Sequence, residues 1–492
     1  MRNNKIILTF LILSLACNIL PTMAFGLKAT KSEKVMEETL GNSILKEEYP
    51  SGSEVSPTET EQNKNEKELV IEGSIEKSLD VNLNDCLKLA LGNNPRIRMA
   101  LNNALASHSR INQVWSNYFP QFSIQSGYSK NRNLQTASMT GASPNEFDYY
   151  LLGQLSLSQL LYDFGVTQNQ VTIKKLDYEW YKTTITSVVN DVICQTKEAY
   201  FNLLYAYEIK KVAKDTVDKY EMFYNQAKAF YEIGLNPKVD VTIAEVNLSD
   251  AKLKLIQAEN GIDMAVAKLN NTMGVPYLNK YNVEERLKFS PIKITMNDSF
   301  ELAKQSRPEL KLADLKIQEA LQVVKLASKA NFPKLEAQGA YGRGGQSFND
   351  TYGFNYGVYL NFPVINAMMT KNLIKEDRAL YDSELSSAQL TKNNVYLEIQ
   401  SAYLSLYEKK NQIPVALLQV KQAKENYELS AGRYKVGVGN PTELKDAQNT
   451  YQSAQLSYYK SLFEYNSAKA QLEKAIGKNI ISNEDDHIDF ES

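Results

Sequence analysis

The chain carries two kinds of hydrophobic pattern, and one changes into the other within a few residues. Before Tyr118 the apolar positions recur at helical spacing, whereas after Pro120 polar and apolar residues alternate, with Phe122 and Ile124 on one side. Proline disfavours helical dihedrals in the residue before it and cannot donate to a helix ladder, so a helix must end here. The pattern predicts a long helix that leads directly into a strand over residues 121–130.

The same pattern is present a second time further along the chain. Matched residues lie 213 positions apart before the first predicted loop: Pro95 and Pro308, Phe119 and Phe332, Pro120 and Pro333. Beyond that loop they lie 203 positions apart: Gly234 and Gly437, Gly274 and Gly477. The offset changes within the loop between two strands, and loops tolerate insertions that paired strands do not. The chain is therefore predicted to contain two copies of one structural unit.

Each copy is predicted to contain a helix, two strands, a long helix, a tight turn and a returning helix. The predicted helices are 85–117, 165–231, 238–273, 299–330, 368–434 and 441–476, and the strands are 121–130, 149–159, 334–342 and 352–362. Apolar and small residues repeat in heptads along the helices, which is typical of coiled coils. Each long helix spans on the order of 100 Å, so two shorter helices stacked end to end match its length. Pro414 is predicted to kink the second long helix.

The remaining segments differ in composition from the two copies. Residues 1–24 combine Arg2 and Lys5 with an apolar run and a small-residue cleavage site, which is typical of a secretory signal. Cys17 leaves lipidation open as an alternative reading of this segment. Residues 25–78 are rich in polar and charged residues and are predicted to form a flexible extension. The two copies then cover 79–274 and 299–478, with a mid-height connector over 275–298 and an acidic tail over 479–492.

Composition and charge exclude several classes of function. Lys and Arg number 55 against 57 Asp and Glu, so the net charge of −2 gives no preference for nucleic acid. Cys86 and Cys194 fall on different predicted helices and are expected to be unpaired core residues. His108 and His487 are the only histidines, and the sequence contains neither an HExxH nor a CxxC motif. We therefore expect no enzymatic activity, no cofactor and no metal site.

The four predicted strands have the length and composition of membrane strands. Each has about ten residues, enough to cross a bilayer when tilted, and aromatic residues crowd them. A soluble sheet with an aromatic core is the alternative. A membrane sheet cannot leave an open edge, and four strands cannot close into a barrel, so chains must associate to give eight strands as a dimer or twelve as a trimer. Twelve strands leave an aqueous lumen more readily than eight.

Over residues 79–478 the chain resembles the TolC-type outer-membrane efflux family. The residues that carry the resemblance are the two Phe-Pro strand entries, LSLSQLLYDFG at 155–165, the Ala-Tyr pairs at 199–200 and 402–403, and the Gly turns followed by Ala-rich heptads. The resemblance implies a mainly α fold with a β-barrel part. Coiled-coil helices of a homotrimer would form a periplasmic α-barrel, continuous with a 12-stranded transmembrane β-barrel that has four strands per chain.

The family also implies a function and partners. The protein would be the exit duct of a tripartite efflux or type I secretion system, a passive conduit from the periplasm through the outer-membrane lipid. Its partners would be a periplasmic adaptor and an inner-membrane pump. A rod-like periplasmic coiled-coil protein or an adhesin is the alternative, because it accounts for the heptads and the export. It does not account for strand pairs at matching places in both copies.

The resemblance assigns roles to residues near the two Gly turns. Adaptor docking falls on the turn residues Gly234, Leu235, Gly437 and Val438. The pore entrance or gate includes Asp240, which occupies the equivalent region of the first copy, and by resemblance Tyr434, Glu443 and Asp446. Threefold copies of the last two acids would give a negative constriction that favours cations. Helix capping is the alternative for both groups, because Gly ends helices and Asn440 followed by Glu443 matches a capping box. Gly439 stands where the family can carry a latch Arg.

Overall fold

The computed structural model describes residues 79–80, 82–132, 146–235, 237–275, 281–282, 286–345, 352–363 and 367–478. The predicted signal, extension and acidic tail lie outside these residues, as do most of the two loops between paired strands. All of the described residues belong to one unit, Ile75–Ser492.

Four strands form one antiparallel sheet. They are β2 (Gln121–Arg132), β3 (Glu146–Tyr162), β5 (Lys334–Gly345) and β6 (Tyr352–Asn361), in the order β2-β3-β5-β6. β3 is 17 residues long and exceeds the predicted 149–159 at both ends. Its start pairs with the end of β2, and its last residues pair with the start of β5. The extra length therefore comes from partners on both sides, which the local alternation of residues does not reveal.

The two faces of this sheet differ in polarity. Because register aligns residues across all four strands, one row reads Ile124, Leu155, Tyr341 and Phe354, and the row beside it on the other face reads Ser123, Ser156, Ala340 and Asn355. The apolar side chains are exposed, with Tyr356 82% and Phe354 68% accessible. Among the described residues no layer covers these aromatic side chains, so the structure gives no support to the alternative of a soluble sheet with an aromatic core.

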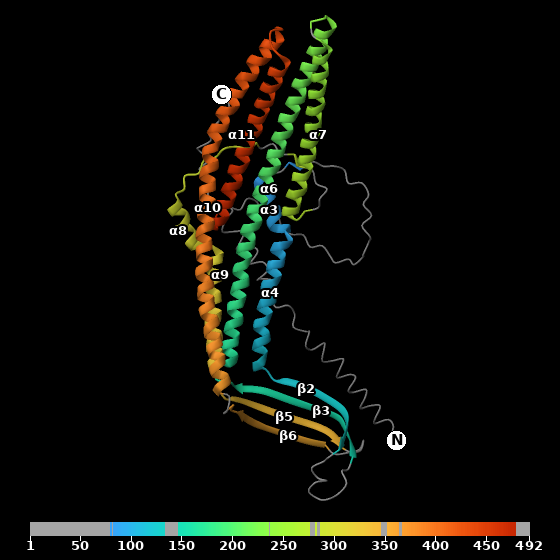
Figure 1. Cartoon of the computed structure of the whole chain (residues 1–492). Coiled ribbons are helices and arrows are strands. Elements are labelled where there is room, and N and C mark those ends of the chain that lie inside the picture. Colours follow the sequence, from blue (N-terminus) through green and yellow to red (C-terminus); the bar gives the residue numbers. More distant parts are fainter. Residues whose placement is uncertain are drawn as a thin grey trace, which may run out of the picture. The chain divides into compact units, whose positions relative to one another are not determined.

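Two long helices and two returning helices follow the predicted ranges closely. The long helices are α6 (Val166–Glu232) and α10 (Ala367–Lys435), and the returning helices are α7 (Lys238–Met273) and α11 (Pro441–Ile476). α6 packs on α7, α11, α4 (Pro95–Trp115) and α9 (Pro308–Ser328), while α10 packs on α11 and α9. Figure 1 shows these helices running alongside one another. α10 continues through Pro414.

The two remaining helices of the prediction are each broken in two. Instead of one helix over 85–117, α3 (Leu83–Asn93) ends before α4, and instead of one helix over 299–330, α8 (Met296–Ser306) ends before α9. Pro95 and Pro308 begin the second helix of each pair. A proline has no N–H to donate and suits the first position of a helix, so each helix restarts where its proline stands.

Each break receives the end of a returning helix. Gly274 ends α7 with φ +67°, and a Cβ there would lie 2.7 Å from the Asn93 carbonyl oxygen. The Asn94 side-chain amide donates to the Thr272 carbonyl oxygen at 2.6 Å, which satisfies an acceptor of the last turn of α7. Gly477 and Arg307 form the equivalent contact at the end of α11. The returning helices α7 and α11 therefore end against the breaks that precede α4 and α9, and not against the starts of the predicted helices 85–117 and 299–330. Glycine is needed for the close approach.

The segment between the two copies is anchored to the helices. β4 (Tyr281–Asn282) pairs in parallel with β1 (Leu79–Asp80), and the Tyr207 hydroxyl donates to the Tyr281 carbonyl oxygen at 2.7 Å. Further along, the Tyr465 hydroxyl donates to the Ser290 carbonyl oxygen at 2.8 Å. α8 begins at Met296, inside the predicted connector range. These contacts tie the connector to α6 and to α11.

The passage from β3 into α6 is held by one buried carboxylate. Asp163 is 3% exposed and accepts from the backbone N–H groups of Gly165 at 3.0 Å and Thr167 at 2.6 Å. Phe164 and Gly165 adopt left-handed backbone conformations with φ of 55° and 80°. The carboxylate thereby supplies acceptors for the first turn of α6, so the strand continues into the helix after a three-residue connection.

Candidate functional site

The two hairpin turns share one backbone arrangement. The N–H groups of Leu235 and Val438 donate to the Phe230 and Arg433 carbonyl oxygens at 2.9 and 3.1 Å. Gly234 and Gly437 have φ of 74° and 80°, which favours glycine. Both turns therefore cap their long helices, as the capping alternative predicted. The side chains of Leu235 and Val438 take no part in these backbone bonds and are 69% and 70% exposed.

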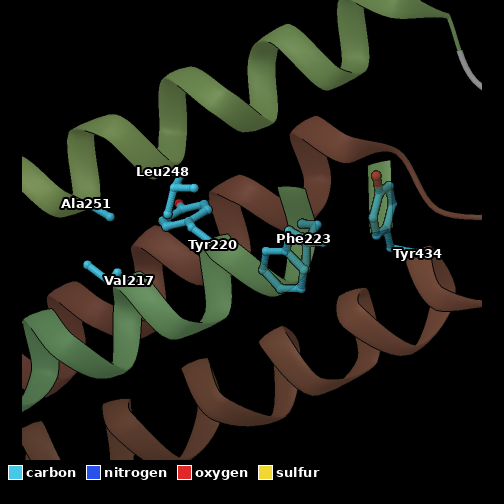
Figure 2. Close-up of a cluster of buried hydrophobic side chains, with 7 residues drawn as sticks. Val217, Tyr220, Phe223, Leu248, Ala251 and Tyr434 are labelled. Carbon is cyan, nitrogen blue, oxygen red and sulfur yellow. The ribbon is translucent and has the colours of Figure 1, made fainter. Parts of the chain in front are cut away.

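A cluster of buried apolar side chains lies next to the turns and joins both copies. It comprises Val217, Tyr220, Phe223, Leu248, Ala251, Tyr434 and Leu444, and Figure 2 draws it and labels all but Leu444. α6 supplies Val217, Tyr220 and Phe223, and α7 supplies Leu248 and Ala251. Tyr434 of α10 and Leu444 of α11 close the cluster from the second copy.

Tyr434 is buried within this cluster, so it does not line an open passage in the single chain. It is 5% exposed, and its ring centroid lies 6.4 Å from that of Phe223 and 6.3 Å from that of Phe230. Burial raises the pKa of the Tyr434 hydroxyl, and the charge of Asp240 raises it further. Asp240 stands in the first turn of α7, where the helix dipole favours an acid. The structure thus brings these two predicted residues near each other from opposite copies.

Tyr220 binds the second copy through its hydroxyl. The hydroxyl lies 3.1 Å from the Asn449 side-chain oxygen and donates to it. Burial raises the pKa of Tyr220 to about 12, with further contributions from the charges of Asp250 and Asp446. The charge of Asp446 therefore acts on the buried Tyr220 hydroxyl, although Asp446 itself is exposed.

Glu443 is exposed on the first turn of α11, and its partner is a residue that the sequence analysis missed. The Arg433 guanidinium of α10 lies 3.0 Å from the Glu443 carboxylate. The Asn440 side chain caps α11, but it accepts from Thr442 N–H at 2.9 Å and not from Glu443 N–H. The capping-box reading of Glu443 is therefore wrong, while the cap by Asn440 is confirmed. The sequence does place the cationic residue Arg433 in the last turn of α10, just before the hairpin turn, and this position could have predicted an ion pair with Glu443.

The described part of the chain contains neither a metal-binding group nor a membrane-spanning helix. No cluster of three His, Cys, Asp or Glu side chains within it is arranged to hold an ion. None of the helices within the same residues combines the length and apolarity needed to cross a bilayer.

Comparison with known proteins places the chain in one family. The model of the outer membrane efflux protein family matches residues 86–275 and 300–478, which is most of the chain and covers both copies. The chain belongs to the outer membrane efflux protein family.

Individual members of this efflux family are distant in sequence but similar over nearly their whole length. The outer membrane protein TolC of Vibrio cholerae is 22% identical over 409 residues, which cover 80% of this chain and 90% of that relative. The probable efflux pump outer membrane protein TtgC of Pseudomonas putida is 21% identical over 445 residues, covering 87% and 89%. The crystal structure of the Campylobacter jejuni CmeC outer membrane channel superposes with a TM-score of 0.67 at 19% identity, covering 87% and 96%.

Membership decides between the two readings of the sequence. The family is one of efflux channels of the outer membrane with long periplasmic helices, so this protein is an outer-membrane efflux channel. The alternative of a rod-like coiled-coil protein or adhesin has no support from the comparisons. The predicted fold class, mainly helical with a membrane sheet, is confirmed by the structure and by its similarity to solved channels.

Proposed function

We propose that the chain assembles as a homotrimer and forms a passive duct from the periplasm to the exterior. The observation that carries the proposal is the two open edges of the sheet. β2 and β6 each pair with one neighbour within the chain, and the outward row of β6 consists of large apolar residues. Unpaired backbone groups are costly in hydrocarbon, so β2 of one copy is expected to pair with β6 of the next. Three copies give twelve strands.

The helices support the same arrangement. Four exposed leucines of α10 fall in one heptad register: Leu390, Leu397, Leu404 and Leu418. α7 carries a second exposed apolar series: Val239, Ile243, Val246, Leu253 and Ile256. Within one chain these two helices pack on different neighbours: α7 packs on α6, whereas α10 packs on α9 and α11. Each series would therefore be covered by the other helix of a neighbouring copy.

We further propose that the hairpin turns form the periplasmic entrance and the adaptor-docking surface. The exposed side chains of Leu235 and Val438 are available to an adaptor, because capping uses only the backbone of the turns. Glu443 and Asp446 of three copies would surround the entrance, with Asp240 beside it and Tyr434 packing the second hairpin against the α6 rings Phe223 and Phe230. An inner-membrane pump would supply the energy for transport, and the duct would need none.

The assembly proposal is tested by fractionation followed by mass and conductance measurements. The protein should extract from the outer membrane with detergent, have the mass of three chains and lose that mass on heating. Reconstituted into planar bilayers, it should conduct ions. A soluble single chain in the periplasm would contradict both the trimer and the duct.

A further inference from the structure

Lys219 bridges two tyrosines of the other copy. Its ammonium nitrogen lies 4.7 Å from the ring centroid of Tyr451 and 4.9 Å from that of Tyr427. The two rings stack on each other at 5.7 Å with 11° between their planes. Lys219 is on α6, Tyr427 on α10 and Tyr451 on α11. One cation thus contacts both helices of the second hairpin from the first copy.

The surroundings favour a cation held by the rings. Lys219 and both tyrosines are half-buried, and burial lowers the pKa of Lys219. Its charged neighbours are Asp215 on its own helix and Lys424 and Glu428 on α10, of which the two acids favour the ammonium form and Lys424 opposes it. Attraction between a cation and an aromatic face strengthens as water is removed, so partial burial makes this contact stronger than an exposed one.

The bridge stands at one end of a continuous line of rings. From Tyr451 and Tyr427 the contacts run to Phe223 at 6.5 Å, to Tyr434 at 6.4 Å and to Phe230 at 6.3 Å. We call these five rings the aromatic ladder. The α6 rings Phe223 and Phe230 are seven residues apart, as are the α10 rings Tyr427 and Tyr434, so they alternate along one seam. The ladder ends beside the turns.

The ladder joins helices that have few other direct contacts. α6 packs closely on α11, whereas its contact with α10 in this region is made by long aromatic side chains. Contacts between aromatic rings contain no hydrogen bond that fixes the position of one helix along the other. Lys219 touches α10 and α11 together, so it opposes displacement of either helix from α6.

We propose that Lys219 is a positioning residue that holds the α10–α11 hairpin against α6 and thereby keeps the entrance acids Glu443 and Asp446 in the placement that this structure shows. The proposal rests on the proposed function, in which these hairpin ends form the entrance. Lys219 acts on the entrance through the two tyrosines and the hairpin that carries them, not through contact with a passing ion.

The test compares Lys219→Met, Lys219→Arg and Lys214→Met. Methionine keeps the length and apolar stem of Lys219 without its charge, arginine keeps the cation, and Lys214 is an exposed lysine of the same helix. In planar bilayers Lys219→Met should change the open fraction of the channel by a factor of roughly three to ten, as expected for the loss of both cation–π contacts of the bridge. Lys219→Arg and Lys214→Met should remain near the unmodified protein.

Hydrogen exchange of the same proteins separates this inference from the proposed function. Lys219→Met should accelerate exchange of amides in the last turns of α10 and the first turns of α11, and Lys219→Arg should not. If the unmodified trimer conducts but Lys219→Met changes neither opening nor exchange, the positioning role is wrong and the duct stands. If the unmodified protein does not conduct, the duct fails, and exchange alone decides whether Lys219 holds the hairpin.

A further variant covers the case in which Lys219→Met does not assemble. Tyr451→Leu keeps Lys219 and the remaining ring but removes one face of the bridge. It should show the same direction of change in opening and exchange, by a smaller factor. Unchanged behaviour of an assembled Tyr451→Leu protein would overturn the inference.

Discussion

The Arg433 guanidinium and the Glu443 carboxylate face each other across the turn between α10 and α11, 3.0 Å apart. The pair is exposed, so its contribution to stability is small. Its electrostatic consequence is larger, because the cation offsets the charge of Glu443, whereas Asp446 forms no ion pair within the part of the chain that the structure describes. Gly439 stands at the position where the resemblance allows an arginine that locks the entrance. Arg433 places a different cation at the same turn.

We predict that neutralising the entrance acids lowers cation selectivity. Glu443→Gln together with Asp446→Asn should reduce the cation-to-anion permeability ratio and relieve block by trivalent cations, because the negative field of the entrance is lost. Asp446→Asn alone should have a larger effect than Glu443→Gln alone. Reversal potentials in salt gradients measure the ratio. Glu425→Gln, at an exposed acid of α10 farther from the turn, is the control.

Removal of Arg433 should act in the opposite direction. Arg433→Gln leaves the Glu443 carboxylate without its cation, so the cation-to-anion permeability ratio should rise in the same reversal-potential measurement. A fall in the ratio would show that these side chains do not face the ion path.

We predict that a charge on the turns abolishes export without dissociating the trimer. Leu235→Asp and Val438→Asp place a carboxylate where the proposal requires apolar contact with an adaptor, while the capping N–H groups remain. Export of a pump substrate from cells and the heat-sensitive trimer band are the two measurements. Leu235→Ser, polar but uncharged, should reduce export less. Normal export by both Asp variants would show that the turns cap the helices and do not dock an adaptor.

The native thiols permit a topology experiment with little background. Cys86 is fully buried, and burial, with a smaller contribution from Glu198, raises the pKa of Cys194 to about 12. A raised thiol pKa means that almost no reactive thiolate is present at pH 7. Ser138→Cys and Ser347→Cys lie in the loops 131–148 and 343–351 between paired strands, which we predict to face the cell exterior. Both cysteines should therefore react with impermeant maleimide on intact cells. Labelling only after the outer membrane is broken would reverse the predicted topology.

The helix breaks should be sensitive to a single methyl group. Gly274→Ala adds a Cβ within 2.7 Å of the Asn93 carbonyl oxygen at a φ of +67°, so it should cost roughly 3 kcal/mol from backbone strain and overpacking together. Gly234→Ala has a similar φ of +74° with nothing within 4 Å, and should cost about 1 kcal/mol. The thermal midpoint of the helical circular dichroism signal compares the two. Equal thermal midpoints for Gly274→Ala and Gly234→Ala would mean that Gly274 is not in close contact with Asn93.

The candidate site was only partly predictable from the sequence. Asp240, Tyr434, Glu443 and Asp446 were located by resemblance, and their roles at an entrance stay predictions. What resemblance did not reveal was their surroundings: Tyr434 is buried, and Glu443 has an arginine partner ten residues earlier. Such pairings depend on how two helices face each other after a turn, and no pattern along one helix specifies that.

By itself the sequence determined the duplication, the long helices, the strand positions and the tight turns. These features depend on neighbouring residues: heptad spacing, polar–apolar alternation, and the backbone limits of proline and glycine. Only the tertiary structure decided how far β3 extends, which glycines press against a helix break, and that Lys219 lies between Tyr427 and Tyr451. In each case the deciding contact comes from a distant part of the chain, so its geometry exists only after the two copies have packed together.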